Sequence, residues 1–341
     1  MSHEIQSAVF SMQEGAGWTG LGLAIDQAIS KEPRKIAELL DALWTVQSKP
    51  VFYQTESGSF KQVNDAAVQV RSDTGEALSV TSATRYHVNN RQPVDILEAF
   101  RDELERERLS ISHAAVLRGG KVIAVSALMN PDSDIKVNGK DLLKSYVTLS
   151  TGYDLQNGTK ATKGTIRVVC NNTLNFSLDE AKRTGQIKTV RASTKLQEHT
   201  LKDLVGNIQT IIEAEKACYD SLANRKMSDA DVAKYFSDVL EINIKDLGKV
   251  DVNGKALIST KSQNMLEALA TAYRNAPGAV GASGNMWGCL NAVTYYATHE
   301  KTVRDTCNDG NLVARVASNI MGDSAKLKQR ALNLAQLAVA A

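Results

Sequence analysis

The fold is decided by one short stretch, AAVLRGGKVIAV at residues 114–125, in which two apolar runs flank a pair of glycines. Glycine adopts positive φ angles at little steric cost, and the tight turns of two-residue β-hairpins need such angles. Gly119 and Gly120 therefore predict a turn that joins two antiparallel strands. We expect this hairpin to lie in an antiparallel sheet beside a strand predicted at 161–170.

Further extended runs lie on both sides of this hairpin. Downstream, β-branched and apolar runs at 142–151 and 161–170 are joined by a loop at 153–158. Upstream, apolar residues flank the Ser-Asp-Thr-Gly sequence at 72–75, which predicts a second hairpin. The central hairpin and the two downstream runs together predict an antiparallel β-meander of at least four strands.

Helices are predicted around and after this meander. Two of them begin at Pro33 and Pro93, because proline suits the first helical position. From about residue 196 onward, apolar residues recur at helical spacing. The helices predicted there are 200–222, one capped by Ser228 and running to 240, 262–273, 286–298, 311–320 and 323–338.

This order of elements predicts the fold class and the domain organisation. Strands that come first and helices that follow are typical of α+β proteins. We expect an antiparallel β-meander with a hairpin, packed against helices and followed by a helical C-terminal half. Residues 1–195 would form the α+β domain with a basic segment, and residues 196–341 a mainly helical region continuous with it.

Charge and hydropathy exclude some classes of protein. The 341 residues include 40 Lys and Arg against 38 Asp and Glu, a net charge of +2. That balance excludes a histone-like polycation and leaves a local basic patch open. No apolar run approaches the roughly 18 residues of a membrane span, and the N-terminus lacks the pattern of a signal peptide. We expect a cytoplasmic protein without a membrane partner.

The sequence carries no strong enzyme motif. HExxH, GxSxG and the phosphate-loop pattern are absent. The glycines at 15–20 match a dinucleotide-binding pattern, but no clear strand leads into them. Cys170 with His199 is a conceivable nucleophile pair, and the carboxylates within 132–141 fit ordinary turn chemistry. We expect no catalytic residue, no metal and no cofactor, with a metal-dependent nucleic-acid enzyme as an alternative.

Residues 156–202 form a basic segment. Nine Lys and Arg stand there against three acidic residues, a local charge of +6, among many Asn, Thr and Ser. Such side chains contact phosphate backbones, although the same composition also suits an exposed connector. Aromatic residues make up only 5% of the chain, so phosphates rather than stacked bases would supply most of the binding. We predict nucleic-acid contacts at Lys160, Lys163, Arg167, Asn171, Asn172, Arg183, Lys188, Arg191 and Lys195.

A set of short motifs spans nearly the whole chain. They are Gly17-Trp18, Trp44-Thr45-Val46, Arg71-Ser72-Asp73-Thr74-Gly75, Tyr86-His87-Val88-Asn89-Asn90, Ile166-Arg167-Val168-Val169-Cys170-Asn171-Asn172-Thr173-Leu174, His199-Thr200, Trp287-Gly288, Asn291-Ala292-Val293-Thr294, His299, Gly322, Lys328 and Ala331. On these motifs the chain resembles the phage/plasmid-like protein family, long classed as a domain of unknown function. The resemblance implies a mobile-element origin and a layout loosely similar to ring-forming single-strand annealing proteins, but no reaction. The family's His-Asp-Gly run is replaced by Tyr153-Asp154-Leu155, which argues against a histidine-dependent reaction there.

These observations favour a phage- or plasmid-encoded, non-enzymatic protein that binds single-stranded DNA and anneals strands in recombination, in the host cytoplasm. The alternative is an accessory protein that binds a host defence or replication factor. Ala331, Leu334, Leu337 and Ala338 form an apolar stripe on the last predicted helix. We therefore expect a homo-oligomer that closes over this stripe.

Overall fold

The computed structural model describes most of the chain. The described residues are 8–11, 23–83, 92–105, 109–153, 159–167, 172–175, 187–190, 208–254, 256–279, 282–304 and 311–340. They form an α+β fold in which antiparallel sheets come first and the C-terminal half is helical. The predicted fold class is confirmed.

One large sheet forms the body of the molecule. Its strand order is β11-β10-β9-β7-β6-β1-β2, with β12 beside β10 and β8 beside β9. In chain order the strands are β1 (Ala8–Ser11), β2 (Leu23–Ile25), β6 (Leu109–Leu117), β7 (Val122–Met129), β8 (Ile135–Val137), β9 (Asp141–Gly152), β10 (Thr159–Arg167), β11 (Asn172–Asn175) and β12 (Ile187–Val190). Apart from the parallel pair β1–β2, neighbouring strands are antiparallel. The predicted meander is therefore confirmed.

The central hairpin forms where the two glycines predict it. Gly119 and Gly120 join β6 to β7 with φ angles of 65° and 90°. The predicted neighbour of this hairpin is wrong, because the hairpin does not lie directly beside β10. The long strand β9 pairs with β7 on one side and with β10 on the other, so it separates the two.

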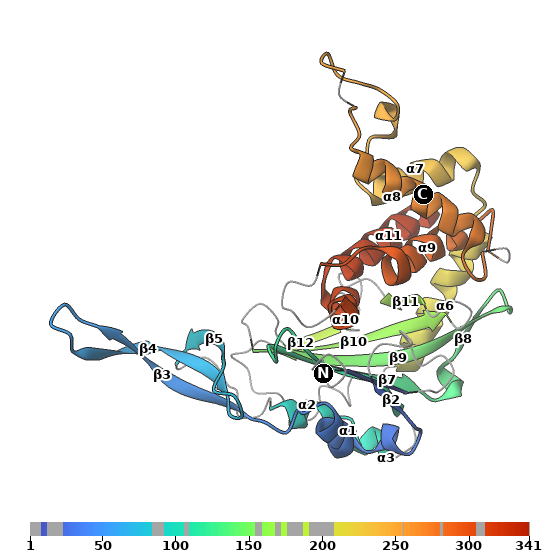
Figure 1. Cartoon of the computed structure of the whole chain (residues 1–341). Coiled ribbons are helices and arrows are strands. Elements are labelled where there is room, and N and C mark those ends of the chain that lie inside the picture. The colour runs from blue at the N-terminus through green and yellow to red at the C-terminus, as the bar shows by residue number, and fades with distance from the viewer. Residues whose placement is uncertain are drawn as a thin grey trace.

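A second, three-stranded sheet projects from the body as an arm (Figure 1). It consists of β3 (Val46–Gln54), β4 (Phe60–Arg71) and β5 (Ala77–Ser82). The β4–β5 hairpin confirms the turn predicted at 72–75. The long ribbon that β3 makes with β4 has no counterpart in the sequence prediction.

Short helices cover one face of the large sheet. They are α1 (Pro33–Leu39), α2 (Pro93–Glu98) and α3 (Arg101–Glu105), and α1 and α2 begin at the predicted prolines. At the start of α2, Gln92 and Asp95 form a reciprocal capping box. Ile36, Leu97 and Ile123 belong to one buried apolar cluster, which joins these helices to the sheet.

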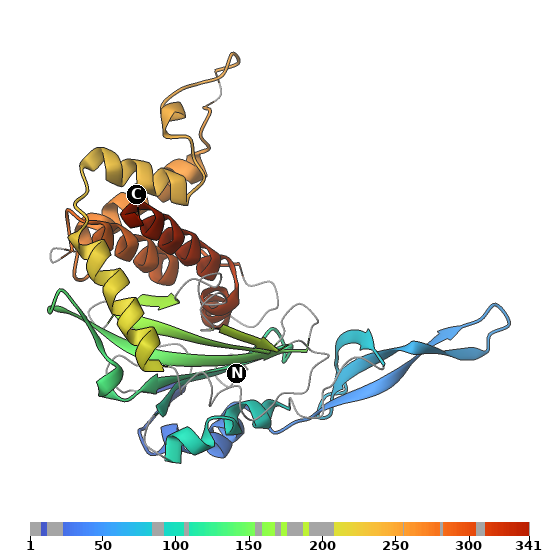
Figure 2. The ribbon, with the colours of Figure 1, turned by 180° about the vertical axis from the view of Figure 1, so that it is seen from behind.

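The C-terminal helices lie on the opposite side of the sheet (Figures 1 and 2). They are α6 (Ile208–Asn224), α7 (Asp229–Val239), α8 (Thr260–Asn275), α9 (Met286–Tyr295), the π-helical turn η5 (Tyr296–Glu300), α10 (Asn311–Met321) and α11 (Asp323–Ala340). Of these, α7 and α8 are stacked on the outside of the other helices (Figures 1 and 2). Ser228 caps α7 as predicted. On the sheet, Leu117 and Val122 pack against Ala317 of α10. None of the described helices is long and apolar enough to cross a membrane.

The apolar stripe on the last helix lies mostly inside this layer. Ala331 is fully buried, and its carbonyl oxygen accepts a 2.8 Å hydrogen bond from the Tyr235 hydroxyl. Leu334 and Ala338 pack against the same helical core, while Leu337 is 66% exposed. Most of the stripe is covered within one chain, so it gives no support to the expected homo-oligomer, which stays a prediction.

Candidate functional site

The described residues of the predicted basic segment lie at one edge of the large sheet. Lys160 and Arg167 are on β10, Asn172 begins β11 and Lys188 is on β12. In the backbone register, Lys188 pairs with Ala161 and Asn172 with Arg167. Outside the described residues lie Asn171, Arg183, Arg191 and Lys195. The described part of the segment is therefore built of paired edge strands.

Lys163 is a correction to the predicted contacts. Its side chain is 1% exposed and forms an ion pair with the fully buried carboxylate of Glu215 on α6. Beside this pair, the hydroxyl groups of Thr165 and Tyr219 are 3.3 Å apart. Burial lowers the pKa of Lys163 to about 7. Lys163 fastens β10 to α6 and has no surface for a phosphate, so its prediction as a nucleic-acid contact is wrong.

The described residues also enclose a basic cleft on the helical side of the sheet. Its volume is about 1350 Å³. Five of its lining residues are cations: Arg118, Lys261, Lys301, Arg304 and Lys326. Among the described lining residues, the acidic ones that oppose them are Glu300 and Asp323, so these described residues carry a net charge of +3. Each of the five cations is at least partly exposed, so their charges can reach a ligand in solution.

Several separate elements supply the cations of this basic cleft. Arg118 begins the β6–β7 turn in a left-handed conformation, with φ of 55°. Lys261 is on α8, Lys326 on α11, and Lys301 follows η5 directly. Arg315 of α10 holds the end of η5 in place, because its Nη1 donates a 3.0 Å hydrogen bond to the carbonyl oxygen of His299.

The corner between α10 and α11 also forms part of the cleft wall. Gly322 lies so close to α10 that a Cβ there would come within 2.7 Å of the Ser318 Cα. The Ser318 and Ser324 hydroxyls are hydrogen-bonded at 2.9 Å across the corner. Beneath it, the buried Nζ of Lys328 donates a 2.9 Å hydrogen bond to Oδ1 of Asn319. Gly322 and Lys328, two of the motif residues, therefore shape and support the cleft wall.

The surroundings of Lys301 in the cleft disfavour its positive charge. The pKa of Lys301 is lowered mainly by burial. Asp323 opposes this shift, whereas the nearby positive charges of Lys261 and Arg315 add to it. An anion bound among these cations would offset their mutual repulsion.

The basic cleft and one part of the described basic segment share an end of the large sheet, while Arg167 and Asn172 lie toward its opposite end. Arg118 follows β6 at the turn, Val122 on β7 pairs with Gly152, and Thr159 on β10 pairs with Val190 on β12. Three strand steps separate β7 from β12, about 14 Å at the usual spacing of neighbouring strands. The two basic regions are close enough to serve one extended ligand.

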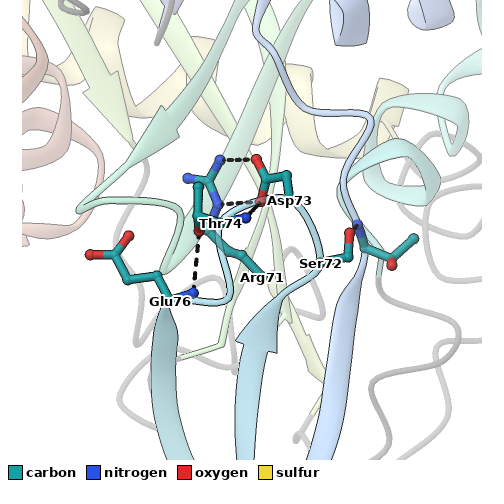
Figure 3. Close-up of polar contacts among 6 residues, drawn as sticks. Arg71, Ser72, Asp73, Thr74 and Glu76 are labelled. Atoms are coloured by element: carbon teal, nitrogen blue, oxygen red, sulfur yellow. Dashed lines mark hydrogen bonds and ion pairs between the residues drawn. The ribbon is translucent and has the colours of Figure 1, made fainter.

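The Arg71–Gly75 motif has a structural role at the base of the arm (Figure 3). Nη2 and Nε of Arg71 donate hydrogen bonds of 2.7 and 3.1 Å to the two carboxylate oxygens of Asp73. The guanidinium also lies 4.4 Å from the ring centroid of Trp44, and a Cβ on Gly120 would come within 3.0 Å of it. The motif therefore anchors the arm against the central hairpin.

The remaining enzyme candidates gain no support. Cys170, His199 and the glycines at 15–20 lie outside the described residues. Asp141 accepts a 2.9 Å hydrogen bond from Nε1 of Trp287, a packing contact. In the described part of the chain, no group of three His, Cys, Asp or Glu residues is placed to hold a metal ion.

Sequence reasoning missed the basic cleft for a physical reason. Its cations lie between positions 118 and 326 and are brought together only by tertiary packing. No local cluster of charge marks them in the sequence.

Comparison with known proteins gives a family and no function. No curated protein and no solved structure matches the chain. The model of a domain of unknown function, DUF932, matches residues 77–318. This agrees with the resemblance to a family of unknown function, and the phage or plasmid origin stays a prediction. Since the match covers well over half of its residues, the chain belongs to the DUF932 family.

Proposed function

We propose that this protein binds single-stranded DNA through the basic cleft and the adjoining sheet end, without catalysis. The observation that carries the proposal is the gathering of five cations from distant parts of the sequence around one open cleft, whose described lining residues carry a net charge of +3. Multiple Lys and Arg side chains without matching carboxylates are the usual means of binding a phosphate backbone. Lys160 on β10 and Lys188 on β12, which lie near the same end of the sheet, support a longer track.

The size of the cleft favours an extended ligand. Pockets for small molecules occupy roughly 300–1,000 Å³, and the basic cleft, at about 1350 Å³, exceeds that range. Its lining also includes the apolar side chains of Met265, Ala268 and Val303. Unpaired bases can lie against such surfaces, whereas the bases of a duplex are stacked on one another. These features favour a single strand over a duplex.

Binding measurements at two salt concentrations test the proposal. Fluorescence anisotropy with single- and double-stranded oligonucleotides should give tighter, salt-dependent binding of the single strand. For single strands, log K falls against log salt with a slope of about 0.7 per phosphate contact. The triple variant Lys261→Gln, Arg304→Gln and Lys326→Gln should therefore flatten the slope by roughly two units and weaken binding of all sequences alike.

A matched control removes the same charge elsewhere. Lys35, Lys216 and Lys234 are exposed lysines outside the cleft lining. Their triple change to glutamine should leave the slope nearly unchanged. If both triple variants bind alike, general charge rather than the cleft attracts DNA, and absence of binding by the unmodified protein refutes the proposal. Strand annealing, phage or plasmid origin and cytoplasmic location belong to the same proposal as expectations from the resemblance.

A further inference from the structure

The β6–β7 turn places a strained residue at the wall of the basic cleft. Arg118, Gly119 and Gly120 have φ angles of 55°, 65° and 90°. The glycines adopt such angles at little cost, whereas an arginine with positive φ is uncommon. Four described residues other than glycine have positive φ, and Arg118 is the one among them that lines the basic cleft. Backbone strain of this kind persists only where the surrounding structure imposes it, and it is frequent at ligand-binding sites.

The base of the arm packs directly against this turn. A Cβ on Gly120 would lie 3.0 Å from Nη1 of Arg71 and 3.2 Å from Cζ2 of Trp44. The Arg71 guanidinium is itself fixed, because it lies over the Trp44 ring and donates two hydrogen bonds to Asp73 (Figure 3). Its side chain is 14% exposed. The turn therefore rests on a rigid pair of side chains.

The cleft lies on the other side of the turn. Leu117 and Val122, which flank the turn, pack against Ala317 of α10, and Ala317 lines the cleft. Trp44, in contrast, belongs to the buried cluster that joins α1 and α2 to the sheet. The turn is thus enclosed between the arm base and the cleft wall, and its conformation decides where Arg118 lies.

A second series of contacts joins the arm to the same turn. The Ser79 hydroxyl on β5 donates a hydrogen bond to the carbonyl oxygen of Tyr153. The backbone nitrogen of Tyr153 donates a 2.8 Å hydrogen bond to the carbonyl oxygen of Lys121, the last residue of the turn. Tyr153 is fully buried, and its ring meets that of Trp44 edge-on with the centroids 6.2 Å apart. The arm therefore contacts the turn both at Gly120 and, through Tyr153, at Lys121.

We propose that Arg71 and Trp44 are positioning residues of the basic cleft, which hold the β6–β7 turn so that Arg118 contacts a phosphate group of the bound strand. This inference rests on the proposed binding of single-stranded DNA. Arginine suits the role, because its guanidinium binds two phosphate oxygens through parallel hydrogen bonds. A turn fixed before binding also reduces the entropy that is lost when a ligand orders a flexible segment.

The contact itself is tested by removing one charge from the turn. In fluorescence anisotropy with a single-stranded oligonucleotide, Arg118→Gln should weaken binding about tenfold, the effect of one charged hydrogen bond. It should also flatten the slope of log K against log salt by about 0.7. Lys121→Gln is the matched control, because Lys121 is exposed in the same turn and is not among the described residues that line the cleft. It should leave the slope nearly unchanged.

A double-mutant cycle tests the positioning. Arg71→Lys keeps the positive charge but loses the paired hydrogen bonds to Asp73 and the stacking on Trp44. It should weaken strand binding several-fold in the unmodified protein and cause no further loss when Arg118→Gln is already present. Trp44→Phe, which places a smaller ring beside the turn and keeps every charge, should show the same dependence. A residue that only stabilised the fold would weaken binding equally in both backgrounds.

A control for this cycle breaks a similar contact far from the turn. Nη1 of Arg330 lies 2.9 Å from a carboxylate oxygen of Glu241 and donates a 3.0 Å hydrogen bond to the carbonyl oxygen of Val239, which joins α11 to the end of α7. Arg330→Lys should leave DNA affinity unchanged in both backgrounds. Circular dichroism checks that every variant is folded, and the Trp44→Phe cycle decides if Arg71→Lys is not.

The outcomes separate this inference from the proposed function. The inference is overturned if Arg118→Gln binds like the unmodified protein while the triple variant of the cleft lysines and Arg304 is weakened. It is also overturned if Arg71→Lys has the same effect with and without Arg118→Gln. In both cases the proposed function stands. Absence of strand binding by the unmodified protein refutes the proposed function and this inference together.

Discussion

Two sets of lysines in this protein have opposite surroundings. Lys163 and Lys328 are buried, and the structure provides each with an internal polar partner, Glu215 and Asn319 respectively. Lys261 and Lys326 line the basic cleft and are exposed. The first set joins elements of the fold, whereas the second leaves its charge available to a ligand. Loss of the first should therefore change stability, and loss of the second should change binding.

The largest effect is expected where the buried ion pair is broken. Glu215→Ala leaves the Lys163 ammonium group without its carboxylate in the core. Removing one partner of a buried ion pair costs about 3–5 kcal/mol, and urea unfolding would measure the loss. The control is Asp238→Ala, which breaks the exposed Lys234–Asp238 pair on α7 and should cost less than about 1 kcal/mol. Equal losses in the two variants would contradict the structural role of Lys163.

The sequence predicts the elements whose signals are local. The Gly119–Gly120 turn needs positive φ angles, and the Ser228 cap needs only a neighbouring backbone amide, so both are predicted from adjacent residues. The burial of Lys163 depends on Glu215, more than fifty positions away. A prediction based on charge density could not distinguish this lysine from its exposed neighbours in the sequence.

Tertiary packing also explains the other differences between the sequence predictions and the structure. The stripe that includes Ala331 is apolar in the sequence whether a second chain or α7 covers it. The basic cleft joins Arg118 of the central turn to lysines of α8 and α11, an arrangement set by helix packing. The edge position of β10–β12 is likewise a property of the whole sheet.

A smaller effect, dependent on pH, is expected at Lys328. Burial lowers its pKa to about 7, against an ordinary value of 10.5. Below pH 7 the folded and unfolded states are both protonated, and the cost of burying the charge is fully present. Between pH 7 and 10 the folded lysine loses its proton first, so stability rises with pH, by at most about 1.4 kcal/mol per pH unit.

The variant Lys328→Met separates this contribution from other titrations. It should be at least as stable as the unmodified protein at pH 7 and should show a flatter rise up to pH 10. Denaturant midpoints measured over this range provide the comparison. A rise that is unchanged in the variant would mean that Lys328 keeps its proton in the folded protein.

Loss of the Arg71–Asp73 interaction at the base of the arm should lower the free energy of unfolding by about 1 kcal/mol, in the range of a single net hydrogen bond. Asp73→Asn removes the negative charge that accepts two hydrogen bonds from Arg71. These bonds are the main reason that the pKa of Asp73 is lowered. The stabilisation that the Asp73 carboxylate gives to the folded protein is therefore present above pH 4 and is lost as the pH falls through the lowered pKa. The variant and the unmodified protein should converge in stability in acid, which thermal unfolding at pH 7 and pH 3 would show.

The smallest change in stability is expected in the basic cleft, at Lys261→Gln. Surface substitutions usually change stability by less than about half a kcal/mol, and Lys261 is exposed. Its positive charge helps to lower the pKa of Lys301, so its removal should raise that pKa toward the ordinary lysine value. Titration of the lysine side chains by NMR would detect this shift, and single-stranded DNA should shift the pKa of Lys301 in the same direction by adding negative charge. A Lys261→Gln variant as unstable as Glu215→Ala would place Lys261 among the lysines that hold the fold together, and the distinction between the two sets would fail.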